Sequence, residues 1–236
     1  MNLILLKEND FTSPGRVTIR GRRFTHIQTV HRAAVGDQLT AGLINNKMGT
    51  ATVTHLTPSS IEMDVTLDQD PPPALDLTLV MALPRPKMLK RILQTVTSLG
   101  VKRIYLVNTW RVEKGFWSSP VLEQESLEEH ITLGLEQAKD TIMPQVFLRR
   151  LFTPFVKEEL ETLSRDTLKL VAHPKGGRVC PCHPGQPITL AMGPEGGFID
   201  REVETFERLG FENVSLGERI LRLETAVPVL ISRLFT

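Results

Sequence analysis

The chain has 236 residues, of which 41% are hydrophobic and 23% are charged, with 16 glycines and 16 prolines. This composition is typical of a folded globular protein and excludes the fibrous, collagen-like and intrinsically disordered classes. The length suggests one large domain or two small ones, and the formal net charge of +1 argues against a uniformly basic nucleic-acid-binding protein.

Neither the first residues nor the cysteines indicate export. The apolar run at residues 3–6 is short and is followed by charged residues, which fits neither a signal peptide nor a membrane span. Cys180 and Cys182 are too close in sequence for an ordinary disulfide, and their C-x-C-H pattern does not match zinc-ligand spacing. We therefore expect a cytoplasmic protein with no membrane partner and no bound metal.

The first 70 residues predict a small β-barrel, because short β-prone segments alternate with turn signals. Phe24, Ile27 and Val30 have helical spacing and predict a short helix over residues 26–32. The polar, proline-rich stretch 68–73 continues neither a strand nor a helix, so we place the domain boundary after residue 70. The predicted strands cover residues 16–20, 38–41, 49–56 and 60–67.

From residue 71 onward, predicted strands and helices alternate. Apolar strands that alternate with amphipathic helices are typical of a parallel sheet covered on both faces, so this domain is predicted to be α/β. Asp200 is the expected N-cap of one helix, and Gly210 marks its end. The predicted strands are 75–83, 101–107, 145–152, 168–172, 188–192 and 213–216, and the predicted helices are 87–99, 123–142, 155–163, 200–209 and 224–234.

Basic residues are concentrated in two stretches that contain no Asp or Glu. Residues 11–36 carry five arginines and two histidines, and residues 77–102 carry a second basic group. Such faces can meet a phosphate backbone even in a nearly neutral protein. Ordinary solvated surface is an equally consistent interpretation of either stretch.

A glycine-rich loop at residues 193–197, Gly-Pro-Glu-Gly-Gly, directly follows a predicted strand and precedes a helix. Glycines let the backbone approach a ligand closely, and open α/β folds bind ligands at the carboxyl ends of strands. The loop lacks the spacing of dinucleotide-binding and P-loop motifs. It indicates a small-molecule site, with a purely structural turn as the alternative.

Two further strand ends carry unusual loops. The segment 215–226 places Arg219, Arg222 and Glu224 in a single connection, and His173 with Pro174 follows another strand. We expect these loops to meet the glycine-rich loop at one edge of the sheet. The alternative is that the arginines form surface ion pairs of little energetic weight.

Three aromatic residues, Trp110, Phe116 and Trp117, flank Arg111 and Lys114 in the loop after the second strand of the α/β domain. Aromatic rings among cations stack nucleobases in some proteins and cap the edge of a core in others. The sequence leaves both interpretations open.

Taken together, these motifs resemble those of the bacterial 16S rRNA (uracil-N3)-methyltransferases of the SPOUT superfamily. The resemblance rests on the His-Pro pair at 173–174, the loop 193–197 and the segment 216–226, and residues 26–32, 99–101 and 136–137 also match family motifs. It implies an α/β fold with a deep trefoil knot in residues 71–236. It also implies a PUA-like RNA-binding β-barrel in residues 1–70.

The resemblance further implies that S-adenosyl-L-methionine binds in the knot, held largely by the backbone of the three loops. Glycines suit this role because they let the main chain close on a ligand. The residues implied for cofactor binding are His173, Pro174, Met192, Gly193, Pro194, Glu195, Gly196, Gly197, Leu216, Gly217, Arg219, Ile220, Leu221 and Thr225.

The implied activity is methyl transfer to N3 of a uridine in 16S rRNA of the small ribosomal subunit, by a homodimer packed partly through the last helix. Uridine N3 must lose its proton before it attacks the methyl group. We expect Arg222 to stabilise the resulting anion, and Glu224 to accept the proton or position the arginine. The residues expected to bind RNA are Arg16, Arg20, Arg22, Arg23, His26 and Arg32.

The sequence departs from the family pattern at Ser98, Asp140 and Leu223, where Glu, Arg and Thr are usual. Asp140 reverses the charge on what is expected to be an RNA-facing surface. Two alternatives follow: an RNA-binding ribosome-assembly factor with little or no methyl transfer, and a methyltransferase acting on a different RNA. An α/β enzyme that uses another nucleotide-like cofactor is a third.

Overall fold

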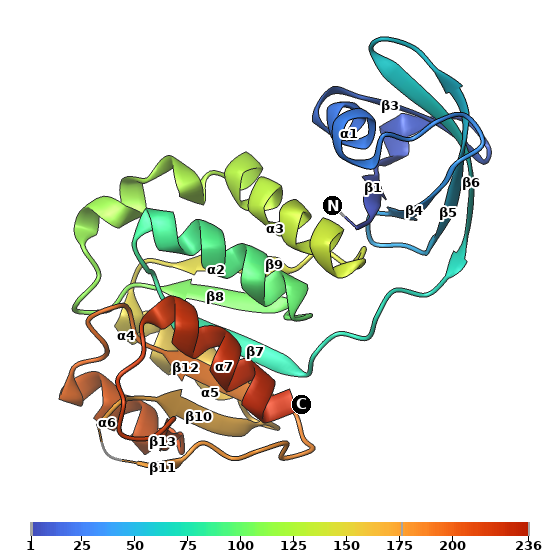
Figure 1. Ribbon diagram of the computed structural model, residues 1–236. Coiled ribbons are helices and arrows are strands. Elements are labelled where there is room, and N and C mark those ends of the chain that lie inside the picture. The colour runs from blue at the N-terminus through green and yellow to red at the C-terminus, as the bar shows by residue number, and fades with distance from the viewer. Residues whose placement is uncertain (1, 176, 236) are drawn as a thin grey trace. The chain divides into compact units, whose positions relative to one another are not determined.

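The computed structural model describes residues 2–175 and 177–235. The chain divides into two compact units, one formed by residues up to Pro73 together with 132–143, and the other by 74–131 and the residues from Pro144 onward (Figure 1). The sequence assigned all of residues 71–236 to one domain. Residues 132–143 group with the first unit because the N–H groups of Asn2 and Leu3 donate to the Glu136 carbonyl (2.8 and 3.0 Å) and that of Asn45 to the Thr141 carbonyl (2.8 Å).

In the described part of the first unit, six strands form one sheet in the order β1-β4-β5-β6-β3-β2, with β1 and β4 parallel and the other pairs antiparallel. The predicted strands are confirmed to within two residues at each end. The first two strands were missed because they are short, and β1 is buried throughout, so no alternation marks it. The strands are β1 (Ile4–Leu6), β2 (Phe11–Ser13), β3 (Arg16–Arg20), β4 (Gln38–Leu43), β5 (Met48–Leu56) and β6 (Ser60–Gln69).

The helix of the first unit begins at Gly21 and not at residue 26, so the predicted start is wrong. Helix α1 (Gly21–His26) continues as η2 (Ile27–His31) and ends at Arg32, whose φ of 53° is left-handed. Two arginines in its first turn form ion pairs that the periodicity of apolar residues does not reveal. The Arg22 guanidinium donates to the buried Glu136 carboxylate (2.9 Å), and that of Arg23 donates to both oxygens of Asp10 (2.6 and 2.7 Å).

The second unit contains a parallel sheet, as the sequence predicts. Its described strands follow the order β11-β13-β10-β12-β7-β8-β9, and every neighbouring pair is parallel. The central strands β7 and β12 are buried along their whole length, which explains their continuous apolar runs. These strands are β7 (Leu77–Ala82), β8 (Arg103–Val107), β9 (Gln145–Arg149), β10 (Leu168–Ala172), β11 (Arg178–Val179), β12 (Ile188–Met192) and β13 (Glu212–Ser215).

Helices cover both faces of this sheet (Figure 1). Helices α2 and α7 pack against each other on one face, and Phe152 of α4 meets Phe206 of α6 on the other. The α/β class is therefore confirmed. The helices are α2 (Pro86–Ser98), α3 (Gln124–Ala138), α4 (Phe152–Pro154), α5 (Glu161–Leu163), α6 (Asp200–Arg208) and α7 (Leu223–Phe235), with short helical turns η1 (Glu8–Asp10), η3 (Lys114–Ser118), η4 (Pro120–Leu122) and η5 (Phe155–Leu160).

Helix α3 ends four residues before the predicted position 142. Lys139 adopts a left-handed φ of 55°, and the Asp140 carboxylate accepts a hydrogen bond from the Ile142 N–H (2.9 Å). Asp140 is buried, so the expectation that it faces RNA is wrong: it closes the turn after the helix.

The expectation that Asp200 caps α6 is also wrong. Asp200 is the first helical residue and Ile199 is the N-cap. The nearly buried Glu202 carboxylate accepts from the Ile199 N–H (3.0 Å) and also from the Trp110 N–H (2.8 Å). Within the described residues, no helix is long and apolar enough to cross a membrane.

The Asp10–Arg23 pair is predicted to be a main contributor to the stability of the first unit. Asp10→Ala should lower the free energy of unfolding by about 2–3 kcal/mol, because it leaves a largely buried guanidinium without its partner. Asp64→Ala is the matched control, since Asp64 pairs with Arg16 at the surface, where such pairs contribute less than about 1 kcal/mol. Urea denaturation followed by circular dichroism measures both, and equal losses would contradict the prediction.

Candidate functional site

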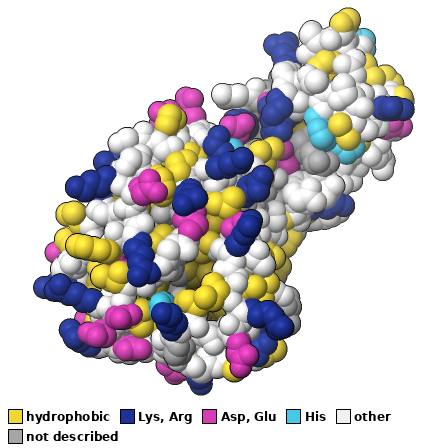
Figure 2. Space-filling model, turned by 60° about the vertical axis from the view of Figure 1, so that its left-hand side comes forward, with side chains coloured by type: hydrophobic (Ala, Val, Ile, Leu, Met, Phe, Trp, Pro, Cys, Tyr) yellow, Lys and Arg dark blue, Asp and Glu magenta, His cyan; other side chains and the backbone are white. Residues whose placement is uncertain are grey.

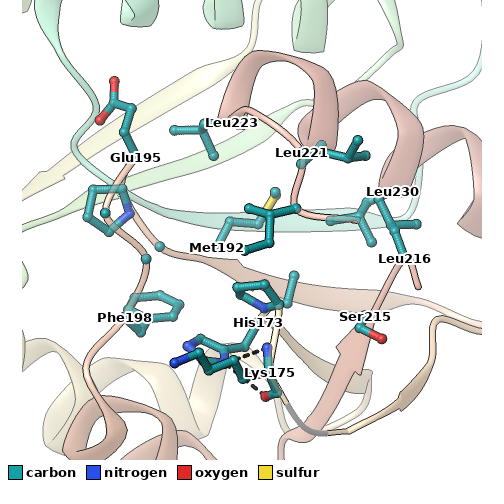
Figure 3. Close-up of a pocket in the computed structure, with 18 of the residues that line it drawn as sticks. His173, Lys175, Met192, Glu195, Phe198, Ser215, Leu216, Leu221, Leu223 and Leu230 are labelled. Carbon is teal, nitrogen blue, oxygen red and sulfur yellow. Dashed lines mark hydrogen bonds between the residues drawn. The ribbon is translucent and has the colours of Figure 1, made fainter. Parts of the chain in front are cut away.

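A cavity of about 400 Å³ lies at the carboxyl ends of β10, β12 and β13. Its lining includes residues from all three loops that the sequence places at one sheet edge, at 173–175, 193–198 and 214–221 (Figure 3). Parallel strands bring their carboxyl ends to the same edge, and ligands of open α/β sheets bind there. The predicted convergence of the three loops is therefore confirmed.

The glycine-rich loop folds tightly on itself after β12. A Cβ at position 193 would lie 2.6 Å from the Phe198 nitrogen and 2.8 Å from the Gly197 carbonyl carbon, closer than real Cβ atoms approach backbone. Gly197 has a φ of 73° and donates its N–H to the Pro194 carbonyl (2.7 Å). Position 193 therefore requires glycine for steric reasons, and position 197 favours it for conformational ones.

Residues of neighbouring loops form hydrogen bonds with the glycine-rich loop. The Glu195 carboxylate accepts a hydrogen bond from the Arg85 N–H (3.0 Å), at the start of α2. The Arg111 guanidinium donates to the Gly196 carbonyl, and Glu202 fixes the turn into α6. The loop is thus anchored by the connections after β7 and β8 as well as by its own turn, which favours a preformed site.

The cavity has an apolar part and a charged part. Figure 3 shows the apolar side chains of Met192, Leu221 and Leu230, which come from β12, the loop after β13 and α7. The backbone N–H of His173 donates to the Val214 carbonyl (3.0 Å). Its ring Nδ1 lies 2.9 Å from the Lys175 carbonyl oxygen and 3.2 Å from the Lys175 nitrogen, so it bonds to the Lys175 backbone in either tautomer. The charged residues in the lining are Arg111, Lys175, Glu195, Asp200 and Arg219.

Most of the predicted cofactor-binding residues line this cavity. Of the predicted cofactor-binding residues, Thr225 is the one that is absent from the described lining of the cavity. Its N–H donates to the Arg222 carbonyl (3.0 Å) at the start of α7. The predicted catalytic residues Arg222 and Glu224 are also absent from the lining, but Leu223 between them belongs to it.

Several lining residues were missed by sequence reasoning. Ala172, Val214 and Ser215 lie beside loops that were identified, so strand ends alone would have indicated them. Arg111 follows β8, which β7 separates from β12, and only the sheet order shows that it reaches the cavity. The missed residues are Arg111, Ala172, Lys175, Phe198, Asp200, Val214, Ser215, Leu223, Ala226 and Leu230.

The predicted RNA-binding residues differ in their surroundings. Arg16 pairs with Asp64 at the surface (3.0 Å), Arg22 and Arg23 form the ion pairs described above, and Arg20 and Arg32 are exposed. The His26 Nε2 is buried and makes no hydrogen bond within the described residues, and burial is the main cause that lowers the pKa of this histidine. Exposed charge for RNA contact in this group therefore comes mainly from Arg20 and Arg32.

In the larger body shown in Figure 2, Lys and Arg side chains are interspersed with acidic and polar ones and surround a central apolar area. The view contains no continuous basic surface. The basic side chains in this view therefore do not form a continuous path along which a phosphate backbone could bind.

The three aromatic residues in the loop after β8 differ in how far they are buried. Trp117 is nearly buried, donates from Nε1 to the Asn108 side-chain oxygen (2.9 Å) and lies under the Arg150 guanidinium at 5.7 Å. Phe116 packs against the hydrophobic core. Trp110 is 80% exposed. The core interpretation therefore holds for Trp117 and Phe116 and not for Trp110.

The structure also shows the surroundings of Ser98 and of the two cysteines, which the sequence had singled out. The Ser98 hydroxyl donates to the Gln94 carbonyl within α2 (2.9 Å). Burial raises the pKa of the Cys180 thiol, whereas Cys182 is exposed. Among residues 2–175 and 177–235, no group of three or more His, Cys, Asp or Glu side chains is arranged to hold a metal ion.

Comparison with known proteins identifies relatives for nearly the whole chain. A family model described as RNA methyltransferase domain matches residues 71–235. Ribosomal RNA small subunit methyltransferase E of Treponema pallidum is 30% identical over 232 residues, covering 96% of this chain and 87% of the relative. The protein of the same name from Synechocystis is 28% identical and covers 92% and 72%, respectively.

Two solved structures that are similar to this chain are also described as methyltransferases. A methyltransferase from Legionella pneumophila with bound SAM has a TM-score of 0.74 at 25% identity, and covers 98% of this chain and 95% of that one. Ribosomal RNA small subunit methyltransferase E of Neisseria gonorrhoeae bound to S-adenosyl methionine has a TM-score of 0.73 with the same identity and coverage. The match of the family model to most of the chain, and of the Treponema protein to nearly all of it, shows that the chain belongs to the RNA methyltransferase family.

Proposed function

We propose that this protein is an S-adenosylmethionine-dependent methyltransferase that modifies N3 of a uridine in 16S rRNA of the small ribosomal subunit. The observation that carries the proposal is the cavity itself, built from the three loops whose sequences resemble the family motifs. Two similar structures contain this cofactor, and several relatives bear the name ribosomal RNA small subunit methyltransferase E.

The cavity fits such a cofactor in size and in chemistry. Its volume of about 400 Å³ lies within the range of roughly 300–1,000 Å³ that is usual for small-molecule sites. Loop 193–198 presents backbone without a side chain at position 193, and Met192, Leu221 and Leu230 supply apolar contact. When bound, S-adenosylmethionine supplies an electrophilic methyl group on a positively charged sulfur.

The residues at the start of α7 are proposed to act on the uridine. Leu221 and Leu223 line the cavity. Arg222 and Glu224 lie next to them in sequence and are absent from the described lining, so their proposed contact with the uridine would be made outside the cavity. Glu224 would accept the N3 proton, and Arg222 would stabilise the negative charge that the base then carries. A rigid cavity wall would hold the base in line for transfer.

We further propose that the C-terminal part of the chain is knotted. The segment around residues 178–183 contacts β13 through a hydrogen bond from the Cys180 N–H to the Ser215 carbonyl (2.8 Å). It also contacts the end of α7, where Arg233 Nε donates to the Cys180 carbonyl (2.6 Å) and the His183 N–H to the Arg233 carbonyl (3.1 Å). The segment 178–183 thus lies against both β13 and α7, and the knot itself is proposed from the family resemblance.

The first unit is proposed to be a PUA-like domain that binds rRNA. Its six-stranded sheet with one helix supports this assignment, as does the acid-free stretch 11–36. Exposed Arg20 and Arg32 are the proposed phosphate contacts, while Arg22 and Arg23 hold the domain together. A homodimer is proposed from the family resemblance, with the partly exposed Val229 of α7 available for the contact.

The alternative of a non-catalytic assembly factor is not favoured. Of the three departures from the family pattern, Asp140 closes a turn and Ser98 bonds within α2, so neither belongs to the cavity lining. Leu223 does line the cavity and adds apolar surface there. The relatives that match the chain over most of its length carry methyltransferase names.

The deciding experiment is transfer of labelled methyl groups from S-adenosylmethionine to small ribosomal subunits that lack the modification. Label recovered as 3-methyluridine in digested RNA is the expected result. Cofactor binding without label in this RNA would contradict the proposed substrate.

Gly193→Ala should abolish S-adenosylmethionine binding in calorimetry, because the added Cβ meets backbone atoms at 2.6 and 2.8 Å that cannot move without opening the loop. Gly115→Ala is the control, since its Cβ would meet no atom within 4 Å. Gly196 is a weaker test, because there a Cβ would meet the flexible Arg111 side chain. Wild-type affinity in Gly193→Ala would remove the loop from the binding site.

Arg222→Ala should lower kcat for methyl transfer by roughly 100-fold, the usual scale for losing one group that stabilises developing negative charge. Cofactor affinity should stay within about twofold of wild type, because Arg222 is not part of the described cavity lining. Single-turnover kinetics and calorimetry separate the two effects. Normal kcat would exclude Arg222 from the reaction.

Arg20→Glu combined with Arg32→Glu should weaken RNA binding and reduce the magnitude of the salt-dependence slope by about 1.4 to 1.8, since each phosphate contact contributes about 0.7 to 0.9. Both residues are exposed, so folding should be unaffected. Filter binding at several salt concentrations measures the slope. An unchanged slope would show that this face does not contact RNA.

A further inference from the structure

The loop after β8, which contributes Arg111 to the cavity lining, also carries an exposed tryptophan. Trp110 is 80% exposed, whereas Trp117 in the same loop is 8% exposed and packs in the core. The exposed indole offers a large, flat aromatic surface that a binding partner can cover.

Its backbone is firmly held although its ring is exposed. The Trp110 N–H donates to the Glu202 Oε1 (2.8 Å), and Glu202 itself is 6% exposed. The other oxygen of Glu202 accepts from the Ile199 N–H (3.0 Å), two residues after the glycine-rich loop. The backbone from which the indole projects is therefore held by a buried carboxylate that also supports the turn after the glycine-rich loop.

The next residue connects Trp110 to the cavity. Arg111 lines the cavity, and its guanidinium donates to the Gly196 carbonyl. Consecutive Cα atoms are about 3.8 Å apart, so the indole projects from the backbone position next to a cavity-lining residue. An exposed aromatic ring with an adjacent cation is the combination with which proteins stack nucleobases.

We propose that Trp110 stacks on the uracil ring of the substrate nucleotide and holds it at the mouth of the cavity. The inference rests on the proposed function, because a base must leave its own stack before its N3 can reach a methyl donor. An indole face replaces the lost base stacking, and Arg111 supplies positive charge beside it. Trp110 is thus a substrate-binding residue and takes no part in proton transfer.

Kinetics with the full chain test this role. Trp110→Ala should raise KM for the RNA by roughly 10-fold to 100-fold, the usual range for losing one aromatic–base stack, and leave kcat within about threefold and cofactor affinity within about twofold. Trp110→Phe, which keeps an aromatic face, should restore most of the loss. Val179→Ala is the control for removing exposed apolar surface, since Val179 is 63% exposed and lies on β11 at the other edge of the sheet.

Fluorescence tests the contact without requiring turnover. The chain has two tryptophans, so the difference between wild type and Trp110→Phe reports Trp110. A short oligouridylate should quench this difference signal, and an abasic oligomer of equal length should not.

The outcomes separate the two proposals. Absence of methyl transfer by the wild type would overturn the proposed function, and the quenching measurement would still decide the role of Trp110. Methyl transfer that is equally efficient in wild type and Trp110→Ala, without quenching, would overturn the stacking role alone. A changed oligomeric state in Trp110→Ala with an unchanged KM for RNA would also overturn it, and would assign the ring to a contact between subunits.

Discussion

The candidate site depends on one steric constraint, the close approach of backbone around position 193. The turn from β12 toward α6 brings the Phe198 nitrogen so near that no side chain fits at Gly193. This tight turn leaves the Gly196 carbonyl and the Glu195 carboxylate positioned for Arg111 and the Arg85 N–H. The loops after three different strands are thereby joined by hydrogen bonds along one wall of the cavity.

Features governed by local pattern were predictable from sequence. The parallel sheet follows from apolar strands alternating with amphipathic helices, and the three loops converge because parallel strands end at the same edge. Nearly all predicted cofactor-binding residues accordingly line the cavity. Contacts between distant segments, such as that of Arg111 with the glycine-rich loop, could not be predicted. They depend on the strand order β12-β7-β8, which no local motif indicates.

Charge was the least predictable property. Five arginines between residues 11 and 36 predict a basic face. In the structure, however, three of them form ion pairs: Arg22 with Glu136, Arg23 with Asp10, and Arg16 with Asp64. These acids lie outside the acid-free stretch or at its border, so a count along the sequence could not include them. Asp140 shows the converse, because an acidic residue expected to repel RNA is buried in a turn.

The carboxylate of Glu202 has a consequence for the order of events at the site. One oxygen holds the backbone of Trp110 and the other holds that of Ile199, two residues after the glycine-rich loop. A single buried group thus supports both the loop proposed for the cofactor and the loop proposed for the base. A shift of this carboxylate caused by a ligand at one loop would move the backbone of the other loop as well. The affinities for the proposed cofactor and for RNA would then be thermodynamically linked, and linkage would require each ligand to change the affinity of the other by the same factor.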